Sequence, residues 1–324
     1  MQLAFVIDPL ATLDPSHDTS VALMEAAQAA GHGVWVTTAD HLSVAGTQAW
    51  ARLWPTELTP VSLADGHWEA AERWYATGES TLSSLQAMDA VLMRTDPPVT
   101  VPYLYATQIL DRLDRQRTPV VNAPRGLQAA NEKLYALQFG ELIPETLVTQ
   151  DRALVRQFVE QHGEAVLKPL DGKGGEGILV LQAGDRNFNS LLELATKQGR
   201  EPIVIQTYLA AASEGDKRII LLDGEPIGAL NRIPQGDEFR GNMAVGGRVA
   251  RASITERDRA ICAQLAPRLR ADGLYLAGID IIGGYLTEVN VTSPTGVREI
   301  DRLEGSRLGK QVVRWLEAWQ QSRQ

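Results

Sequence analysis

The N-terminal part of the chain alternates short apolar runs with amphipathic stretches. The run QLAFVI (2–7) predicts a strand, and DTSVALMEAAQAAGHG (18–33) predicts a helix with Asp18 or Thr19 as its N-cap. A second apolar run, VWVTT (34–38), predicts the next strand. Strand, helix and strand at this spacing form a βαβ unit, which implies a parallel sheet with a right-handed crossover.

The same pattern continues as far as Asn122. MDAVLMR (88–94) and PVVN (119–122) predict strands, and YLYATQILDRLDRQ (103–116) predicts the helix between them. We therefore expect residues 1–122 to form an open parallel α/β domain. Residues 45–80, rich in Trp and His, give no resolvable pattern and are expected to include a peripheral insertion.

Beyond Asn122 the pattern changes to a mixture of helices and hairpins. A helix led by Pro124 is expected first, and strands and helices alternate after it as far as residue 209. The expected strands are 145–150, 165–170, 177–182 and 202–209, and the expected helices are 151–162 and 187–198.

The last third of the chain predicts two hairpins and two helices. Asp223-Gly224, within DKRIILLDGEPIGALNR (216–232), is a strong signal for a two-residue hairpin turn. Helices are expected at 255–272 and 306–321. The expected class is α/β, with α+β character in the C-terminal half, in three domains spanning 1–122, 123–203 and 204–324.

Composition and charge narrow the possible functions. The chain has 324 residues, 44% hydrophobic and 22% charged, which suits two or three globular domains. Its net charge of −9 argues against nonspecific binding to nucleic acid or to anionic membranes.

Cys262 is the single cysteine, so no intrachain disulfide can form, and we expect a buried thiol in a reducing compartment. The N-terminus lacks signal-peptide features and no apolar run is long enough for a membrane span, so a cytoplasmic location is expected.

A glycine-rich segment, KPLDGKGGEG (168–177), contains the pattern G-x-G-x-x-G. A dinucleotide-binding turn would have to open a helix, and a P-loop would need Ser or Thr after Lys173; neither condition is met. A strand on each side instead predicts a hairpin whose loop covers a nucleotide triphosphate, with Lys168 reaching the phosphates. The alternative from these residues alone is a glycine-rich hairpin without a ligand. Glu176 serves no purpose beside phosphates, and we expect it to point to solvent.

The segment GIDIIGGYLTEVNV (278–291) carries three oxygen ligands in apolar surroundings. Glu288 and Asn290 lie two residues apart on one strand and share a face. Asp280 joins them if it pairs with Glu288, and for this we predict a three-residue turn in which Ile282 pairs with Leu286. Such a set suits Mg²⁺, which takes a few carboxylates together with substrate phosphates. A solvated sheet face is the alternative.

Basic side chains cluster in an otherwise acidic protein. A hairpin around Asp223-Gly224 would bring Arg218 and Arg232 near one another. The stretch 233–248 contains four glycines and little periodicity, which is typical of a mobile lid. Solvent-exposed arginines on a loose loop are the alternative for Arg240 and Arg248.

The order of these motifs resembles that of the prokaryotic glutathione synthetases, a family of ATP-grasp carboxylate–amine ligases. The similar runs include LMRTDPP (92–98), NEKLYAL (131–137), LKPLDGKGG (167–175), GDKRIILLDGEPI (215–227) and TEVNVTSPTGVREI (287–300). They span most of the chain in the family's order. The resemblance implies an ATP-grasp fold whose nucleotide lies between the second and third domains.

The resemblance also assigns roles to residues of this sequence. Three groups of residues are implied to contact ATP, the metal and the substrates, and Arg218, Arg232 and Lys168 are implied to be catalytic. The groups are Lys133, Lys168, Gly172, Gly174, Gly175, Gln206, Tyr208 and Leu209 for ATP; Asp280, Glu288 and Asn290 for the metal; and Arg94, Asp216, Arg218, Arg232, Asn290 and Ser293 for substrate. Residues 235–247 would form the lid.

The implied reaction joins γ-L-glutamyl-L-cysteine to glycine, with ATP converted to ADP and phosphate through an acyl phosphate. The implied cofactors are ATP as co-substrate and Mg²⁺ or Mn²⁺, as two ions. The resemblance implies a homo-oligomer acting on small molecules, without nucleic acid or membrane partners.

Three alternatives differ in class or substrate. Another ATP-grasp ligase, such as a D-alanine–D-alanine ligase or a glutamate ligase, would differ around Arg94 and Ser293. A noncatalytic nucleotide-binding regulator on the same fold would be expected to lack Lys168 or a metal ligand, and all are present. A nicotinamide-dependent oxidoreductase is disfavoured because no helix is predicted after the glycine loop.

Overall fold

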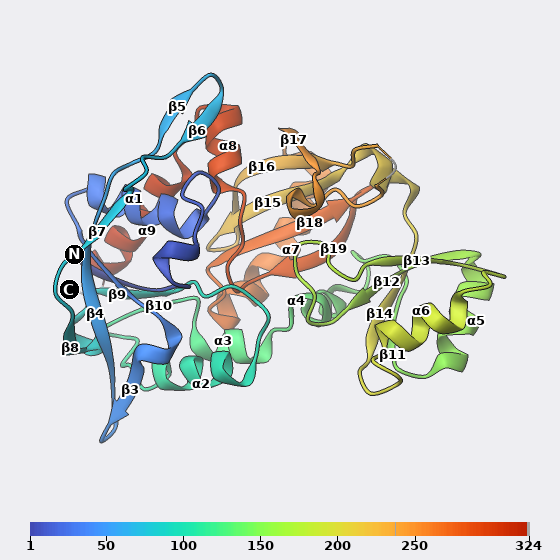
Figure 1. Ribbon diagram of the computed structural model, residues 1–324, viewed down its shortest axis with the longest axis horizontal. Coiled ribbons are helices and arrows are strands. Elements are labelled where there is room, and N and C mark those ends of the chain that lie inside the picture. Colours follow the sequence, from blue (N-terminus) through green and yellow to red (C-terminus); the bar gives the residue numbers. More distant parts are fainter. Residues whose placement is uncertain (237, 323–324) are drawn as a thin grey trace.

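The N-terminal part forms a parallel sheet with one antiparallel side. The computed structural model describes residues 1–236 and 238–322. Four strands are parallel, in the order β10, β9, β1 and β2 (Figure 1), and this confirms the predicted βαβ unit. The bounds are β1 (Gln2–Val6), α1 (Thr19–Ala29), β2 (Gly33–Thr37), β9 (Ala90–Met93), α2 (Val101–Leu110) and β10 (Val120–Val121).

The segment 45–80, which gave no sequence pattern, extends this sheet. The long strand β4 runs antiparallel to β2 and also pairs with β3, β7 and β8, while β5 and β6 form a separate hairpin beside α8. The strands are β3 (Leu42–Ala45), β4 (Gln48–Leu58), β5 (Ser62–Ala64), β6 (His67–Glu69), β7 (Tyr75–Thr77) and β8 (Thr81–Ser84). The short helices η1 (Leu10–Thr12), η2 (Ala39–His41) and η3 (Leu85–Ala87) lie in connections of this part.

The predicted single helix after Asn122 is broken into shorter pieces. Ala130 is extended, and the side chain of Asn131 accepts hydrogen bonds from the N–H groups of Lys133 and Leu134 and so starts a second helix. The pieces are α3 (Pro124–Ala129), α4 (Glu132–Tyr135) and η4 (Ala136–Phe139). This break lets Glu132 and Lys133 face the C-terminal sheet, where both make polar contacts.

A second, four-stranded sheet has its own small apolar core. Its order is β11, β14, β12 and β13, all antiparallel, and two helices cover it (right in Figure 1). The predicted boundary between residues 203 and 204 falls inside β14, so this sheet continues to Thr207. The bounds are β11 (Thr146–Thr149), α5 (Arg152–His162), β12 (Glu164–Pro169), β13 (Leu179–Gln182), α6 (Phe188–Ala195) and β14 (Ile203–Thr207).

The third sheet has the order β17, β16, β15, β18 and β19, and it forms the middle of the molecule in Figure 1. Helix α8 was not predicted, and the lid segment ends in strand β17 rather than in irregular chain. The bounds are η5 (Ala210–Glu214), β15 (Asp216–Leu222), β16 (Glu225–Ile233), η6 (Met243–Val245), β17 (Arg248–Arg251), α7 (Glu256–Asp272), β18 (Leu276–Ile282), β19 (Tyr285–Asn290), α8 (Val297–Glu304) and α9 (Leu308–Gln321). Asp237, within the predicted lid, lies outside the described residues.

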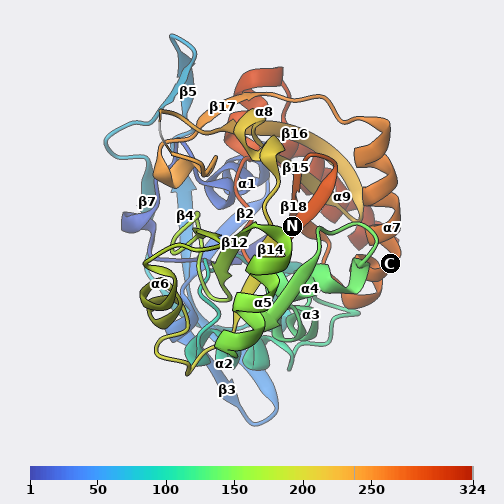
Figure 2. The same cartoon turned by 90° about the vertical axis from the view of Figure 1, so that its right-hand side faces the viewer.

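The C-terminal helices return to the N-terminal part. Leu308, Val312 and Leu316 share a buried apolar cluster with Leu3 and Phe5 of β1, so α9 covers the first sheet together with α1. Figure 2 shows the α9 ribbon behind the strands of the third sheet from a second direction. No helix among the described residues combines the length and the apolar character that crossing a bilayer demands. Cys262 is buried and unpaired, as predicted, and burial raises the pKa of its thiol to about 12.

Candidate active site

The turn that joins β18 to β19 differs from the prediction. Ile282 pairs with Tyr285, not with Leu286, so the three-residue turn was wrong. Gly283 and Gly284 have φ values of +57° and +81°, and a two-residue turn of this kind requires positive φ at both positions. A β-bulge then inserts Thr287 as an unpaired residue, which restores the pairing of Asp280 with Glu288. The predicted neighbours are therefore correct, but for a different reason.

Charged side chains form a row across one face of the third sheet. Arg218 on β15 pairs with Asp280 on β18, and Asp280 pairs with Glu288 on β19, so all three side chains share one face. Asp216 is two residues before Arg218 and pairs with Arg232 on β16, which brings both onto the same face. The hairpin predicted around Asp223-Gly224 is confirmed, and a β-bulge that leaves Ile227 unpaired brings Arg232 opposite Asp216.

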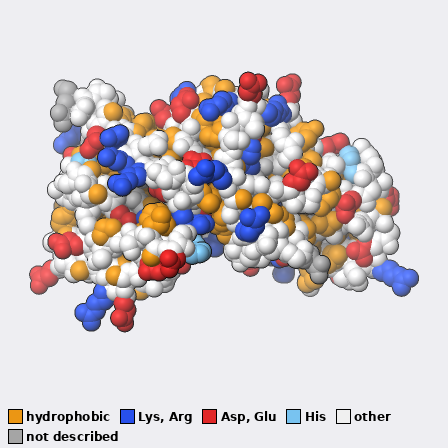
Figure 3. Space-filling model, turned by 90° about the horizontal axis from the view of Figure 1, so that it is seen from above, with side chains coloured by type: hydrophobic (Ala, Val, Ile, Leu, Met, Phe, Trp, Pro, Cys, Tyr) orange, Lys and Arg blue, Asp and Glu red, His pale blue; other side chains and the backbone are white. Residues whose placement is uncertain are grey.

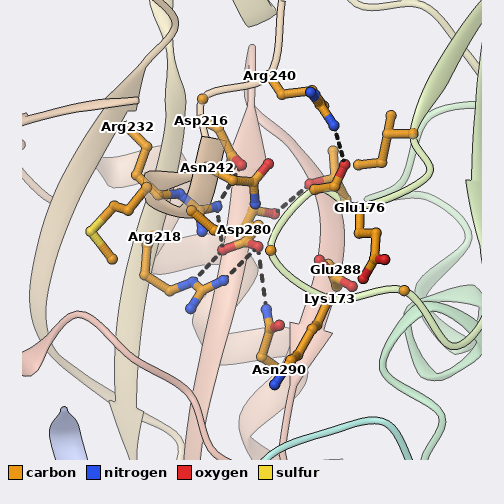
Figure 4. Close-up of a pocket in the computed structure, with 18 of the residues that line it drawn as sticks. Lys173, Glu176, Asp216, Arg218, Arg232, Arg240, Asn242, Asp280, Glu288 and Asn290 are labelled. Carbon is orange, nitrogen blue, oxygen red and sulfur yellow. Dashed lines mark hydrogen bonds and ion pairs between the residues drawn. The ribbon is translucent and has the colours of Figure 1, made fainter. Parts of the chain in front are cut away.

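Asp280 is the hub of this row (Figure 4). Arg218 binds it through two nitrogens, at 2.5 Å from Nε to Oδ1 and 2.9 Å from Nη2 to Oδ2. Arg232 Nη2 lies 3.0 Å from Asp280 Oδ1 and 2.5 Å from Asp216 Oδ2. Asn290 Nδ2 donates to Asp280 Oδ2 at 3.2 Å. Both oxygens of the Asp280 carboxylate therefore have partners.

Burial and ion pairing act in opposite directions in this cluster. Burial would raise the pKa of Asp280, but Arg218 and Arg232 outweigh it and hold that pKa well below its ordinary value. Burial would lower the pKa of Arg218, but Asp280 outweighs it and raises that pKa. Burial dominates at Asp216 and raises its pKa to about 6, although Arg232 opposes the rise. Asp280 is thus a permanent anion, whereas Asp216 exchanges its proton near neutral pH.

We expect the substitution Asp216→Asn to flatten the pH dependence of stability in the metal-free protein. The pKa of Asp216 rises from 3.8 to about 6 on folding, so its stabilising contribution is complete at low pH and is lost as the pH rises through 6. Relative to the variant, the wild type should lose roughly 1–3 kcal/mol of unfolding free energy between about pH 4 and about pH 6. Urea titrations across this interval measure the effect, and parallel profiles of the two proteins would contradict it.

Asp280, Glu288 and Asn290 fit a hard divalent cation. Two carboxylates and one amide converge on one sheet face, and the Glu288 side chain is 21% exposed toward the cavity. Among the described residues no group of three His, Cys, Asp or Glu side chains is arranged to hold a metal. A set of only two carboxylates suits Mg²⁺ or Mn²⁺, because substrate phosphates and water can complete the coordination.

Two lysines face the same space from the central part of the chain. Lys133 Nζ donates to the carbonyl of Gly172 at 2.7 Å and lies 3.2 Å from Glu288 Oε1. Lys168 on β12 lines the cavity, and its amine makes no hydrogen bond or ion pair with the residues that the structure describes. Burial lowers the pKa of Lys168, while Glu288 and Asp216 oppose that shift. An amine desolvated in this way gains most when an anion arrives.

The glycine loop lies between two antiparallel strands, β12 and β13, as predicted. Gly174 and Gly175 have positive φ, and a Cβ at Gly175 would lie 2.7 Å from Asn242 Oδ1 of the lid segment. Arg240 Nη1 donates to the carbonyl of Gly175 at 2.8 Å. The loop and the lid are therefore in contact, and glycine is needed at the contact itself. Glu176 is exposed, as expected.

These elements surround a cavity of about 920 Å³. Gln206, Tyr208 and Leu209, predicted to meet the adenine, line it where β14 ends. Gln206 is fixed there because its Nε2 donates to Thr146 Oγ1 at 3.0 Å. Figure 3 shows a furrow between the left-hand and right-hand parts of the surface, with Lys and Arg side chains along it. A cavity of this size on which charged side chains converge is typical of a ligand site.

Arg94 is the one predicted substrate residue that does not line this cavity. It is 3% exposed, and it donates to Ser20 Oγ at 3.1 Å and to the carbonyl of Pro294 at 3.1 Å. Ser293, next in the chain to Pro294, does line the cavity. In this structure Arg94 therefore contacts the loop of Pro294 at the border of the cavity and does not line the cavity itself.

Sequence reasoning missed Glu132. This partly buried carboxylate accepts hydrogen bonds from the N–H groups of Val291 and Thr292 at 2.9 and 3.1 Å, and from Thr292 Oγ1 at 2.8 Å. It thereby ties the helix that carries Lys133 to the strand end that carries Asn290. Its sequence context, a carboxylate in the first turn of a helix, is too common to signal such a role.

Comparison with known proteins identifies both halves of the chain. The family profile described as "Prokaryotic glutathione synthetase, N-terminal domain" matches residues 1–128, and that described as "Prokaryotic glutathione synthetase, ATP-grasp domain" matches residues 132–305. A protein named glutathione synthetase from Thermosynechococcus vestitus is 65% identical over 98% of this chain and 99% of its own length. One of the same name from a Nostoc species is 63% identical over 98% of each chain.

Solved structures share the fold at low sequence identity. The ATP-grasp ligase PsnB in complex with a minimal precursor has a TM-score of 0.64 at 20% identity, over 98% of both chains. The D-cycloserine synthetase DcsG has a TM-score of 0.64 at 18% identity, over 100% of both chains. These similarities show the ATP-grasp fold.

Proposed function

Since the chain belongs to the prokaryotic glutathione synthetase family, we propose that its cavity joins γ-L-glutamyl-L-cysteine to glycine while ATP is converted to ADP and phosphate. The observation that carries this proposal is the Asp280 cluster, which sets a metal-ligand face and two arginines opposite the free amine of Lys168. That combination suits phosphoryl transfer to a carboxylate.

We propose that ATP lies between the second and third sheets. Lys133, Lys168 and the backbone of the glycine loop at Gly172, Gly174 and Gly175 would bind its phosphates. Gln206, Tyr208 and Leu209 would contact the adenine. The contact between the glycine loop and the lid supports this placement, because it encloses the phosphate end of the cavity.

Asp280, Glu288 and Asn290 would hold Mg²⁺ or Mn²⁺. We propose that two such ions bind together with ATP. When bound, the metal neutralises charge on the transferring phosphoryl group. Asp280 is already ionised because Arg218 and Arg232 hold its pKa low, so no proton has to leave before it binds a cation. Titration of Mg²⁺ and Mn²⁺ into the enzyme with an unreactive ATP analogue measures which of the two metals binds more tightly and how many ions bind.

The reaction requires no covalent nucleophile from the protein. An oxygen of the cysteinyl carboxylate attacks the γ-phosphorus, the bond to ADP breaks, and an acyl phosphate forms. The glycine nitrogen then attacks the acyl carbon, and phosphate leaves as the amide loses a proton. Arg218, Arg232 and Lys168 would stabilise the negative charge that develops at both steps. Asp216, Asn290 and Ser293 would position the substrates, with Arg94 holding the loop of Ser293.

We expect Arg232→Ala to lower the turnover number about a hundredfold, the scale of one lost oxyanion donor. Its guanidinium is 4% exposed and lies within reach of both Asp216 and Asp280, so it faces the reacting groups rather than solvent. Initial rates at saturating substrates measure the change. Arg257→Ala is the control, because that arginine donates to the turn carbonyl of Gly284 and lies outside the lining of the cavity. An unchanged turnover number for Arg232→Ala would refute the role.

Phosphate release from ATP tests the function itself. With Mg²⁺ present, release should require γ-glutamylcysteine and should become sustained when glycine is added. Release that ignores the dipeptide would reject the assignment. Chelation of the metal should abolish the reaction in every arm.

We also propose a cytoplasmic homo-oligomer. The unpaired, buried Cys262 supports a reducing compartment. Val101 and Tyr105 on α2 are 58% and 60% exposed, and apolar side chains on one exposed helix support an interface between copies. Light scattering on the purified protein measures the oligomeric state.

A further inference from the structure

His17 and Glu299 form a pair that the reaction above does not use. The two residues are 282 positions apart in the chain, and His17 Nδ1 lies 2.7 Å from Glu299 Oε1. His17, in the loop before α1, lines the cavity, and its side chain is 68% exposed. The side chain of Glu299, in the first turn of α8, is 3% exposed.

The burial of Glu299 determines which ring nitrogen of His17 faces the cavity. A buried carboxylate is costly unless a cation or hydrogen-bond donors compensate for it. Glu299 Oε2 has no hydrogen-bond partner, and His17 supplies the ion-pair contact of Oε1 within the described part of the chain. The ring nitrogen Nδ1 therefore donates to Glu299. The other nitrogen, Nε2, is left for the cavity, and a ring that carries protons on both nitrogens presents an N–H donor there.

The wall around His17 has a distinct charge pattern. Within the described chain, residues 1–122 contribute Asp14, Asp18 and Asp96 to the cavity lining, and no Lys or Arg. His17 is thus the only side chain of that wall able to carry a positive charge. An acidic wall with one cationic point can bind a zwitterion, with its ammonium near the carboxylates and its carboxylate at the imidazolium.

The proposed dipeptide substrate carries such a zwitterion at the end away from the reacting carboxylate. Its reacting end must lie at Arg218, Arg232 and Lys168, which line the cavity from the second and third sheets and not from the wall of residues 1–122. We infer that His17, held by Glu299, binds the α-carboxylate of the γ-glutamyl group and so selects γ-glutamyl peptides. This inference rests on the proposed function, and it makes His17 a specificity-determining residue and Glu299 its positioning residue.

Two dipeptides that differ only in this carboxylate test the inference. γ-Glutamylcysteine carries it, and 4-aminobutyrylcysteine lacks it. We expect the wild type to prefer the first in kcat/KM by about tenfold to hundredfold, the range of a hydrogen bond to a charged group. His17→Gln should lose this factor for γ-glutamylcysteine, chiefly through KM, and should treat both dipeptides alike. The KM for ATP should stay unchanged.

Further variants separate recognition from folding. His17→Lys restores a positive charge and should recover most of the preference, and Glu299→Gln should weaken it. His67→Ala, an exposed histidine on β6 outside the cavity lining, is the matched control. Thermal melting of each variant checks that it is folded, and glutarylcysteine, which lacks only the ammonium, should be bound poorly by wild type and His17→Gln alike.

The outcomes are distinguishable. A wild type that ligates γ-glutamylcysteine but does not discriminate against 4-aminobutyrylcysteine overturns the inference alone. Equal losses for both dipeptides in His17→Gln also overturn it, because they indicate a structural role. A wild type that does not ligate γ-glutamylcysteine at all overturns the proposed function and this inference with it.

Discussion

Replacing Asp280 by Asn is expected to lower the ligation rate by at least about a thousandfold and the free energy of unfolding by about 3–5 kcal/mol. The rate falls because the proposed metal loses its permanently ionised ligand. The stability falls because Asp280 compensates two buried guanidinium groups, Arg218 and Arg232, which are 6% and 4% exposed. An Asn side chain is neutral, so it leaves Arg218 buried without its ion pair and removes one of the two carboxylates that pair with Arg232. Steady-state rates and urea titrations measure the two effects.

Glu288→Gln is the control that separates the two effects. Glu288 belongs to the same proposed metal site, but its side chain is 21% exposed and its ion pair is with Lys133 alone. We expect a comparable loss of rate with a change in stability within about 1 kcal/mol, the range of a partly exposed ion pair. If Asp280→Asn kept its rate, the metal role would be refuted. If both variants lost equal stability, the hub role of Asp280 would be wrong.

Lys168→Met is expected to change activity and stability in opposite directions. The amine of Lys168 makes no hydrogen bond or ion pair with the described residues, and its burial outweighs the attraction of Glu288 and Asp216, so its charge is unfavourable in the folded protein without nucleotide. A methionine of similar length should raise the free energy of unfolding by about 1 kcal/mol. The turnover number should fall by about a hundredfold to a thousandfold, because a preorganised cation at the phosphates is lost.

Melting curves without and with ATP measure the change in stability, and initial rates measure the change in turnover number. Lys197→Met is the matched control, since its side chain is 51% exposed and pairs with Glu201 on the surface. It should leave the turnover number unchanged. A Lys168→Met protein that is less stable than wild type would mean that the amine has a partner in the protein and does not await a ligand.

The sequence alone determined the parts of the site that depend on local structure. Strand patterns on both sides of Gly172–Gly177 were sufficient to identify a hairpin loop, because a helix after the loop would have needed a different periodicity. Asp223-Gly224 identified the second hairpin in the same way, since a two-residue turn pairs Leu222 with Glu225. Both features follow from neighbouring residues, whereas the bulge at Ile227 that brings Arg232 opposite Asp216 does not.

Only the tertiary structure decided the rest. The bulge at Thr287 sets the register of Asp280 and Glu288, and whether a hairpin carries a bulge depends on the packing of both sheet faces. Arg94 is buried and donates to the carbonyl of Pro294. Residues 45–80 contain the long strand β4, which pairs with β7 and β8, and no local pattern predicted these strands. His17 and Glu299 meet because α8 packs against the N-terminal part of the chain. Side chains far apart in sequence meet only where the packing of whole elements brings them together, and the local pattern of residues does not encode that packing.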